Sequence, residues 1–489
     1  MNFRQVLHAL IAAGTLTAMA ACTPSDSDEI PVAVIADPAD LSVSGVRLSD
    51  AGRMVRAATS EGLVAFDAEG RVVPALADRW IVTDDGMSYI FRLREGSDGV
   101  GAISGERARD ALRQALASLR GTALALDLDG ISDVRAMTGR VLELRLSHPM
   151  PDLLDLLAQP EMALLDRGKG SGEFQYRRTK GGGLLKPLPP ESRGLPEDPK
   201  WEGSVRSVLL KPLSGDKATK AFADKDTDLV LGGTLADYAA GRSVSGISQR
   251  FLRIDPVTGL FGLAVTGGEG PLDKPELREA LAMAIDRDAL AADLAVPGWL
   301  PTSRIIPAGV ADAAQGIGER WANIDMETRR ATASQRLSRA VKGGKIDLRL
   351  ALPAGSGADV LFARLQADLG AIGVTLRRVG QDAPADLRLV DSVARYSRAD
   401  WFLNQLACAA GRPLCSVAAD LRAADARAQA DPAKRAELLS EAEAQLTLAN
   451  TYIPLGSPIR WSLVRDPQPG FAINARGYHP LSPIARRPK

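Results

Sequence analysis

One segment in the second half of the chain restricts the fold more than any other, because it has the pattern of a strand, a helix and a second strand. Residues 346–350 alternate apolar and charged side chains, which is the period of a strand with one buried face. A helix is expected over 359–369 and another strand over 374–379. Strands joined in this way favour a parallel or mixed sheet whose faces are covered by helices, so we predict an α/β protein.

The rest of the chain continues the alternation of strands and helices. Ser104, Asp286 and Asp431 are each placed to cap the start of a helix, because a short polar side chain there accepts a hydrogen bond from a free backbone amide. Further strands are expected at 89–93, 142–146, 205–210, 228–231 and 259–265, and further helices at 108–119, 217–223, 275–285 and 432–449.

Three regions are expected to contain turns or irregular backbone. Residues 168–203 are crowded with glycine and proline, which predicts a long irregular surface segment. Residues 74–80 are expected to form a turn and a short helix packed on a strand. The run Asp84-Asp85-Gly86 has the composition of a hairpin turn.

Composition excludes several classes of function. The chain has 489 residues, enough for two or more domains, and its 60 Lys and Arg balance its 60 Asp and Glu. Without a basic excess, no nucleic-acid partner is expected. The three histidines, His8, His148 and His479, are too few for a multi-histidine metal or catalytic centre, and neither a G-x-S-x-G nor an H-E-x-x-H motif occurs. We expect no enzyme activity, no cofactor and no metal.

The amino terminus has the layout of a secretory leader. A single arginine precedes a largely apolar run over 6–20, small residues follow, and the chain turns polar directly after Cys22. This arrangement resembles a bacterial lipobox, so residues 1–22 are expected to be a lipoprotein signal peptide, Cys22 a lipidated residue, 23–30 a tether and the periplasm the location. The alternative is ordinary cleavage near Ala21 that leaves Cys22 as a free thiol. The apolar run is shorter than the ~20 residues that span a bilayer.

Cys408 and Cys415 lie close together in the sequence. In an oxidising compartment such a pair forms a disulfide, and closing this short loop would stabilise the fold by roughly 2–3 kcal/mol. Two buried thiols are the alternative.

Three segments, in order and in register, resemble the bacterial extracellular solute-binding protein family 5. These are the oligopeptide-, dipeptide- and nickel-binding subunits of ABC importers. The segments are 61–96, beginning EGLVAFD; 259–287, beginning GLFGLAV; and 431–455, ending in YIPL. The same residues also have structural roles in turns, caps and helices, so they identify the scaffold and not the ligand.

The resemblance implies a two-lobed periplasmic-binding-protein fold of the class II type, with an extra subdomain on the first lobe. Mapped onto this chain, the first lobe combines 31–58, 165–255 and 455–489. The added subdomain is 59–164 and the second lobe is 256–454. Hinge strands are expected near 255–256 and 454–457.

The resemblance also implies a ligand site between the lobes, where an aspartate commonly meets a peptide ammonium. Asp391 or Asp400 is expected in that role. Arg395 or Arg398 is placed to clamp a carboxylate, and Trp401 to offer an apolar wall or a cation–π face. Alternatively this run is a solvated face and Trp401 is core, and the Gly-Trp-rich pattern of relatives around the aspartate is absent. The candidate ligand-binding residues are Arg47, Ser49, Asp391, Arg395, Arg398, Asp400, Trp401 and Asn404.

The function that these expectations favour is a lipid-anchored binding protein, monomeric, that captures a small solute, with a peptide as the first class, and delivers it to the permease subunits of an ABC importer. The alternative is the same scaffold used as an envelope sensor or interaction module. Thr23 after Cys22 modestly favours that alternative, because in Gram-negative lipoproteins the lack of Asp at this position tends to direct the protein to the outer membrane.

Overall fold

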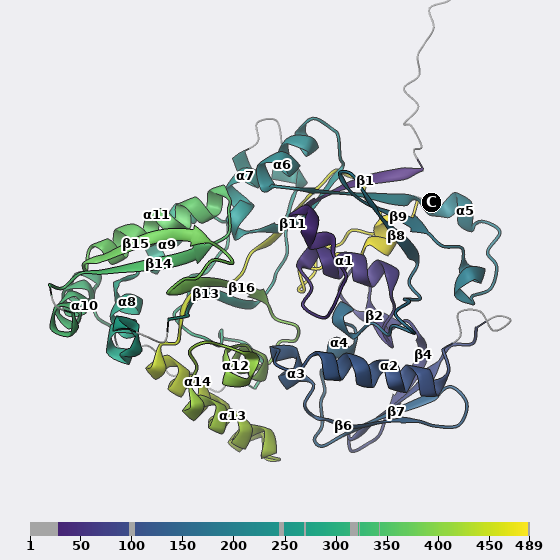
Figure 1. The fold of residues 1–489 in the computed structure, drawn as a ribbon, viewed down its shortest axis with the longest axis horizontal. Coiled ribbons are helices and arrows are strands. Elements are labelled where there is room, and N and C mark those ends of the chain that lie inside the picture. Colours follow the sequence, from purple (N-terminus) through teal and green to yellow (C-terminus); the bar gives the residue numbers. More distant parts are fainter. Residues whose placement is uncertain are drawn as a thin grey trace, which may run out of the picture.

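The computed structural model is a mixed α/β protein built on three main sheets, the seven-stranded, the five-stranded and the four-stranded sheet (Figure 1). It describes residues 28–96, 103–243, 249–267, 270–312, 321, 323–341 and 343–487. The expected leader, Cys22 and the first part of the tether lie outside these residues. β1 begins at Glu29, so the last two residues of the expected tether belong to a strand.

The seven-stranded sheet combines segments from both ends of the chain. Its order is β12-β18-β11-β1-β10-β9-β8, and β1 pairs in parallel with β10 on one side and β11 on the other. Val32 and Val34 of β1 are fully buried, as expected of a central strand. The strands are β1 (Glu29–Ile35), β8 (Phe174–Thr179), β9 (Gly182–Pro187), β10 (Ser207–Leu213), β11 (Leu229–Thr234), β12 (Leu252–Ile254) and β18 (Arg460–Val464).

The expectation of an irregular segment over 168–203 is wrong, because β8 and β9 form a hairpin there and extend the seven-stranded sheet. The glycines let neighbouring strands approach each other closely, and do not only allow the chain to turn. A Cβ at Gly182 would lie 2.0 Å from the carbonyl oxygen of Leu210, and one at Gly183 would lie 2.3 Å from the ring of Tyr176. Glycine therefore lets β9 lie against its neighbours, a use that composition alone does not separate from a loop.

The five-stranded sheet has the order β15-β14-β16-β13-β17 and contains the predicted strand–helix–strand unit. β14 and β15 are parallel and α11 connects them, so this prediction is confirmed. Every residue of β13 is buried, and successive side chains enter two different cores: Phe261 and Leu263 on one face, Leu260 and Ala264 on the other. The strands are β13 (Gly259–Val265), β14 (Ile346–Leu352), β15 (Val374–Gly380), β16 (Leu387–Val393) and β17 (Tyr452–Gly456).

The four-stranded sheet is antiparallel, with order β4-β5-β7-β6, and shares one continuous apolar core with the seven-stranded sheet. The turn at Asp84-Asp85-Gly86 joins β4 to β5 as predicted. The short helix expected near residue 80 is wrong, since Trp80 lies within β4 and packs against Phe91 of β5. The strands are β4 (Ala77–Val82), β5 (Ser88–Leu93), β6 (Ile131–Ala136) and β7 (Val141–Leu146), and a separate pair is β2 (Val64–Phe66) with β3 (Val72–Pro74).

Helices cover the sheets and carry the predicted caps. The side chains of Ser104, Asp286 and Asp431 accept hydrogen bonds from backbone amides at the starts of α2, α9 and α14, which confirms all three. No described helix is long and apolar enough to cross a membrane. The α-helices are α1 (Asp50–Thr59), α2 (Gly105–Ser118), α3 (Ala123–Asp127), α4 (Leu153–Leu157), α5 (Trp201–Ser204), α6 (Gly215–Ala223), α7 (Tyr238–Ser243), α8 (Pro275–Ala284), α9 (Arg287–Leu294), α10 (Met326–Ala340), α11 (Ser356–Gly370), α12 (Ala399–Leu406), α13 (Val417–Ala428), α14 (Pro432–Ala449) and α15 (Leu481–Ile484).

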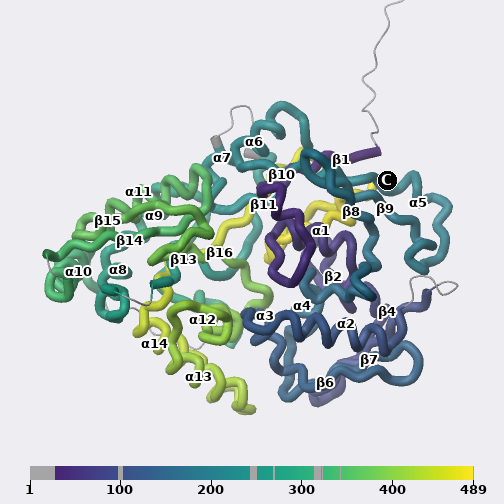
Figure 2. The backbone as a smooth tube through the Cα atoms, viewed as in Figure 1, coloured from purple at the N-terminus to yellow at the C-terminus, as the bar shows by residue number. Residues whose placement is uncertain are grey.

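The chain passes between the seven-stranded and five-stranded sheets at 255–258, from β12 to β13, and at 457–459, from β17 to β18 (Figure 2). The side chain of Asp255, at the first crossing, is 1% exposed. It accepts a hydrogen bond from the backbone N–H of Asn474 at 2.9 Å and contacts Nε2 of His479 at 3.1 Å. The C-terminal segment therefore fixes the start of this crossing. The lobe boundaries and hinge positions expected from the sequence stay predictions.

Candidate ligand-binding cleft

A cleft lies between the elements of the seven-stranded sheet and those of the five-stranded sheet. It holds two neighbouring cavities of about 440 and 180 Å³. Their walls share Leu48 and Glu161 from the first half of the chain and Arg395 and Gln405 from the second half. We call the first the larger cavity and the second the smaller cavity.

The start of α1 forms one wall of the cleft. Ser49 is its N-cap: the hydroxyl accepts a hydrogen bond from the N–H of Gly52 at 3.0 Å and donates to the carbonyl of Asp40 at 2.6 Å. This cap orients the helix so that Asp50 and Arg53, in its first turn, line the smaller cavity. The hydroxyl of Ser49 is thus used by the fold, although Ser49 was a candidate ligand-binding residue.

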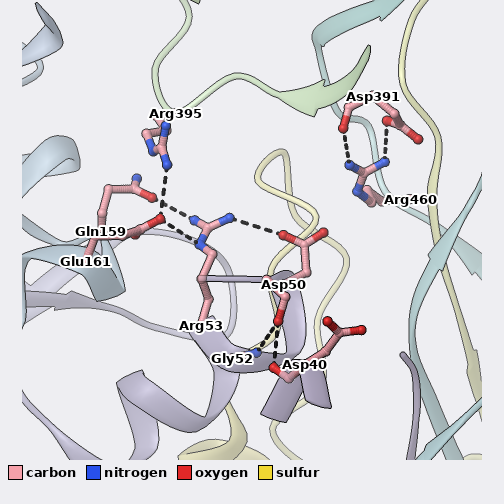
Figure 3. Close-up of polar contacts among 10 residues, drawn as sticks. Asp40, Asp50, Gly52, Arg53, Gln159, Glu161, Asp391, Arg395 and Arg460 are labelled. Atoms are coloured by element: carbon pink, nitrogen blue, oxygen red, sulfur yellow. Dashed lines mark hydrogen bonds and ion pairs between the residues drawn. The ribbon is translucent and has the colours of Figure 1, made fainter. Parts of the chain in front are cut away.

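Glu161 is the centre of a group of buried charges (Figure 3). Its side chain is 3% exposed, and its Oε1 lies 3.5 Å from Nε of Arg53 and 3.0 Å from Nη2 of Arg395. Arg53 also donates to Oε1 of Gln159 at 2.8 Å. Burial alone would raise the pKa of Glu161, but the two guanidinium groups outweigh it and lower the pKa. Glu161 is therefore a carboxylate that links a residue before the first crossing to one beyond it.

A second buried ion pair joins Asp391 of β16 to Arg460, the first residue of β18. Nη1 of Arg460 donates to Oδ1 of Asp391 at 2.7 Å, and Nη2 donates to the Asp391 carbonyl at 3.3 Å (Figure 3). Burial raises the pKa of Asp391, and Arg460 opposes that effect. Asp50 lines the same cavity with its side chain 57% exposed, and there Arg460, Arg53 and Arg395 outweigh its partial desolvation and lower its pKa. The guanidinium of Arg460 thus lies beside Asp391, one of the two aspartates that were expected to meet a ligand ammonium.

The opposite wall consists of α12 and the loop that follows it. Trp401 is 1% exposed and packs at right angles against Phe402, yet it also lines the smaller cavity. Cys408 and Cys415 are joined by a disulfide with Cα atoms 5.1 Å apart. The loop that this bond closes places Arg412 on the wall of the larger cavity, where Nε of Arg412 donates to the Gln405 carbonyl at 2.7 Å.

Three candidate residues lie in a different place, a narrow cavity of about 50 Å³ beside α3. Arg398 forms ion pairs with Asp152, at 3.4 Å, and with Asp312, and Asp400 pairs with Arg435. Nδ2 of Asn404 donates to Asp127 at 2.9 Å. These side chains hold α12 to its neighbours.

The structure thus brings Arg47, Asp391, Arg395 and Trp401 together at the cleft and places Ser49, Arg398, Asp400 and Asn404 outside its two cavities. Whether any of them contacts ligand stays a prediction. Sequence reasoning missed further cleft residues: Asp50, Arg53, Glu161, Arg388, Gln405, Arg412, Arg460, Arg476 and Tyr478. Arg53 could have been found from its place one turn beyond the candidate residue Ser49, and Arg460 from its place just past the expected hinge near 454–457.

Comparison with known proteins identifies the scaffold. The model of the bacterial extracellular solute-binding proteins, family 5, matches residues 71–411, more than half of the chain. The chain belongs to this family. The family is one of solute-binding proteins and not of enzymes. In the described residues no group of three or more His, Cys, Asp and Glu could hold a metal ion.

Relatives agree over nearly the whole length. The periplasmic oligopeptide-binding protein OppA of Salmonella typhimurium is 23% identical over 545 aligned positions, which cover 97% of each chain. Haemophilus influenzae OppA, solved with the peptide RPPGFSPFR, superposes with a TM-score of 0.81 at 15% identity, covering 94% of this chain and 99% of that one. AgaA of A. tumefaciens R10, solved with agropinic acid, superposes with a TM-score of 0.74 at 20% identity, covering 94% of this chain and 99% of that one. The predicted α/β, two-lobed fold is confirmed, and at such identities the structures establish the fold alone.

Proposed function

We propose that this protein is the solute-binding subunit of an ABC importer, anchored on the periplasmic side of the membrane by a lipid on Cys22. It captures a small solute between its lobes and delivers it to the permease subunits. Short peptides are the first class to test, because the Salmonella relative that aligns over 97% of the chain is named an oligopeptide-binding protein. In this proposal the lobes and the added subdomain have the boundaries expected from the sequence.

The observation that carries the proposal is the construction of the cleft. The larger cavity is lined by residues from before the first crossing and from between the two crossings, and the smaller cavity also by residues after the second crossing, so neither sheet alone forms the site. With the crossings at 255–258 and 457–459 as hinges, rotation of one lobe against the other would open and close both cavities together. A solute that contacts both walls favours the closed arrangement by its differential affinity.

The test is a search for a bound solute. Native mass spectrometry of the purified protein looks for a co-purified molecule, and thermal melts with short peptides, nickel chelates and oligosaccharides look for stabilisation. A solute at a hundred times its dissociation constant stabilises the folded state by about 2.7 kcal/mol, which a melt detects. A protein that carries no solute and responds to none of these classes would contradict the proposal.

A second function, an envelope sensor or interaction module, has one observation in its favour. Protein side chains already bridge the two walls: Arg395 pairs with Glu161, and Tyr396 and Asn404 both donate to Asp127. Such bridges could hold the cleft closed without a solute. Uptake assays on a deletion strain separate the two, since only the importer function predicts loss of solute uptake that the wild-type gene restores.

A further inference from the structure

The cleft has an excess of positive charge. Its two cavities are lined by three carboxylates, Asp50, Glu161 and Asp391. Lysine and histidine are absent from both linings. The arginines of these linings are seven: Arg47, Arg53, Arg388, Arg395, Arg412, Arg460 and Arg476.

All three carboxylates already have arginine partners. Glu161 is shared between Arg53 and Arg395, and Asp391 is bound by Arg460 at 2.7 Å. Asp50 lies 3.5 Å from Nη1 of Arg53. The carboxylates of Glu161 and Asp391 are therefore occupied by arginine, whereas Asp50, whose side chain is 57% exposed, has only the longer contact with Arg53.

Three arginines of the larger cavity have no such partner. Arg47, Arg388 and Arg412 form no ion pair with any residue in the described part of the chain. Each makes a hydrogen bond to a backbone carbonyl, of Gly121, Ala383 and Gln405 respectively. A guanidinium has five N–H donors, so most of their donor capacity is unused. Arg412 is the most enclosed of the three, and burial lowers its pKa, which is the effect of removing a charge from water without a counter-charge.

Buried polar groups around the cleft point to the same ligand chemistry. Nε2 of Gln405, Nε1 of Trp401, Nε of Arg53 and Nε of Arg395 are buried without a hydrogen-bond partner. The hydroxyl of Tyr478 and Oε2 of Glu161 are also buried without one. Gln405 and Trp401 are 8% and 1% exposed, so water does not satisfy them freely. Four of these atoms can only donate and one, Oε2 of Glu161, can only accept, so unmet donors outnumber unmet acceptors, and a buried donor left unmet is destabilising. The cleft thus offers donors to a molecule that brings acceptors.

We infer that the solute carries at least two carboxylates, which bind to the unpaired arginines of the larger cavity and to the free donors beside them. The inference rests on the proposed binding function and specifies the charge of the solute. Arginine suits this role because its planar donor fork matches a carboxylate in two parallel hydrogen bonds. The required chemistry is shared by acidic peptides and by non-peptide dicarboxylates.

The test is calorimetry and thermal melting of the purified full-length protein with four probes. These are tripeptide pools that carry two Glu, no charged side chain, or two Lys, and a mixture of succinate, glutarate and adipate. We expect the acidic probes to bind at least tenfold more tightly than the neutral and basic pools, with an affinity that falls as salt is raised. The acidic peptide and dicarboxylate arms identify which source supplies the two carboxylates.

Variants separate a charge effect from a folding effect. Arg412→Gln and Arg388→Gln are each expected to weaken the acidic probes tenfold or more, while Arg79→Gln, an exposed arginine on β4, leaves them unchanged. Neutral or basic pools that bind best, or acidic affinity that neither cleft variant alters, would overturn the inference and leave the binding function standing. No response to any probe would count against both.

Discussion

Asp127, at the end of α3, is a buried carboxyl group that makes the stability of the protein depend on pH. It is 5% exposed, and it accepts hydrogen bonds from the hydroxyl of Tyr396 at 3.0 Å and from Nδ2 of Asn404 at 2.9 Å. Burial raises the pKa of Asp127 to about 7, although those two hydrogen bonds and the charge of Arg395 lower it and Asp400 raises it slightly. Its other oxygen has no partner. The folded protein therefore holds a proton here that an unfolded chain releases near pH 3.8.

The sign and size of the effect follow from the two pKa values. Between pH 3.8 and about 7 the folded state binds more protons than the unfolded state, so the free energy of unfolding falls as the pH rises. Each pH unit lowers the free energy of unfolding by about 1.4 kcal/mol, and the whole interval lowers it by about 4 kcal/mol at most. Above pH 7 the contribution is flat. Both donors come from the opposite wall, and their hydrogen bonds favour the ionised carboxylate, so they oppose the effect of burial.

Asp127→Asn keeps an acceptor for Tyr396 and Asn404 and removes the titration. Urea unfolding at pH 5, 6, 7 and 8 should give a wild-type stability that falls with pH and a variant curve that is flatter by about 1 kcal/mol per unit up to pH 7. Asp84→Asn, in the exposed turn between β4 and β5, is the matched control and should keep the wild-type slope. Equal slopes for wild type and Asp127→Asn would refute the reasoning.

Three further changes probe the structure. Replacing Cys408 and Cys415 together by serine should lower the free energy of unfolding, measured in urea, by roughly 2–3 kcal/mol. The loss should be no larger than that of the reduced wild-type protein, and a variant as stable as the oxidised wild type would contradict the prediction. Gly357→Ala, normally favourable in a helix, should instead destabilise by about 1–3 kcal/mol, because the new Cβ would lie 2.0 Å from the carbonyl oxygen of Leu235; an unchanged melting temperature would contradict this. Glu161→Gln should cost about 3 kcal/mol, since it leaves two arginines without their carboxylate, and a neutral result would show that the pair contributes little.

Local patterns predicted elements whose period is visible in the sequence. The unit from β14 to β15 and the three caps follow from nearest-neighbour chemistry, and the structure confirms them. The hairpin of β8 and β9 was missed because its glycines serve contacts with β10 and Tyr176, and such contacts depend on the assembled sheet.

The charges of the cleft were harder to predict for the same reason. Arg460 is 69 residues from Asp391, and Glu161 is 234 residues from Arg395. No spacing rule connects positions so far apart in the chain. The sequence identified Asp391 and Arg395 as charged residues of interest, but only the fold shows that each already has a protein partner.

The order of strands in the seven-stranded sheet has a consequence for how the chain is made. β18, near the carboxyl end, lies between β11 and β12, so both of these strands have an open edge until residues 460–464 have left the ribosome or the export channel. The five-stranded sheet, by contrast, is complete once β17 has emerged. The half of the molecule that contains the first strand is thus the last to be finished. A chain cut before β18 would expose two hydrogen-bonding edges to aggregation, even though it would contain every strand of the other sheet.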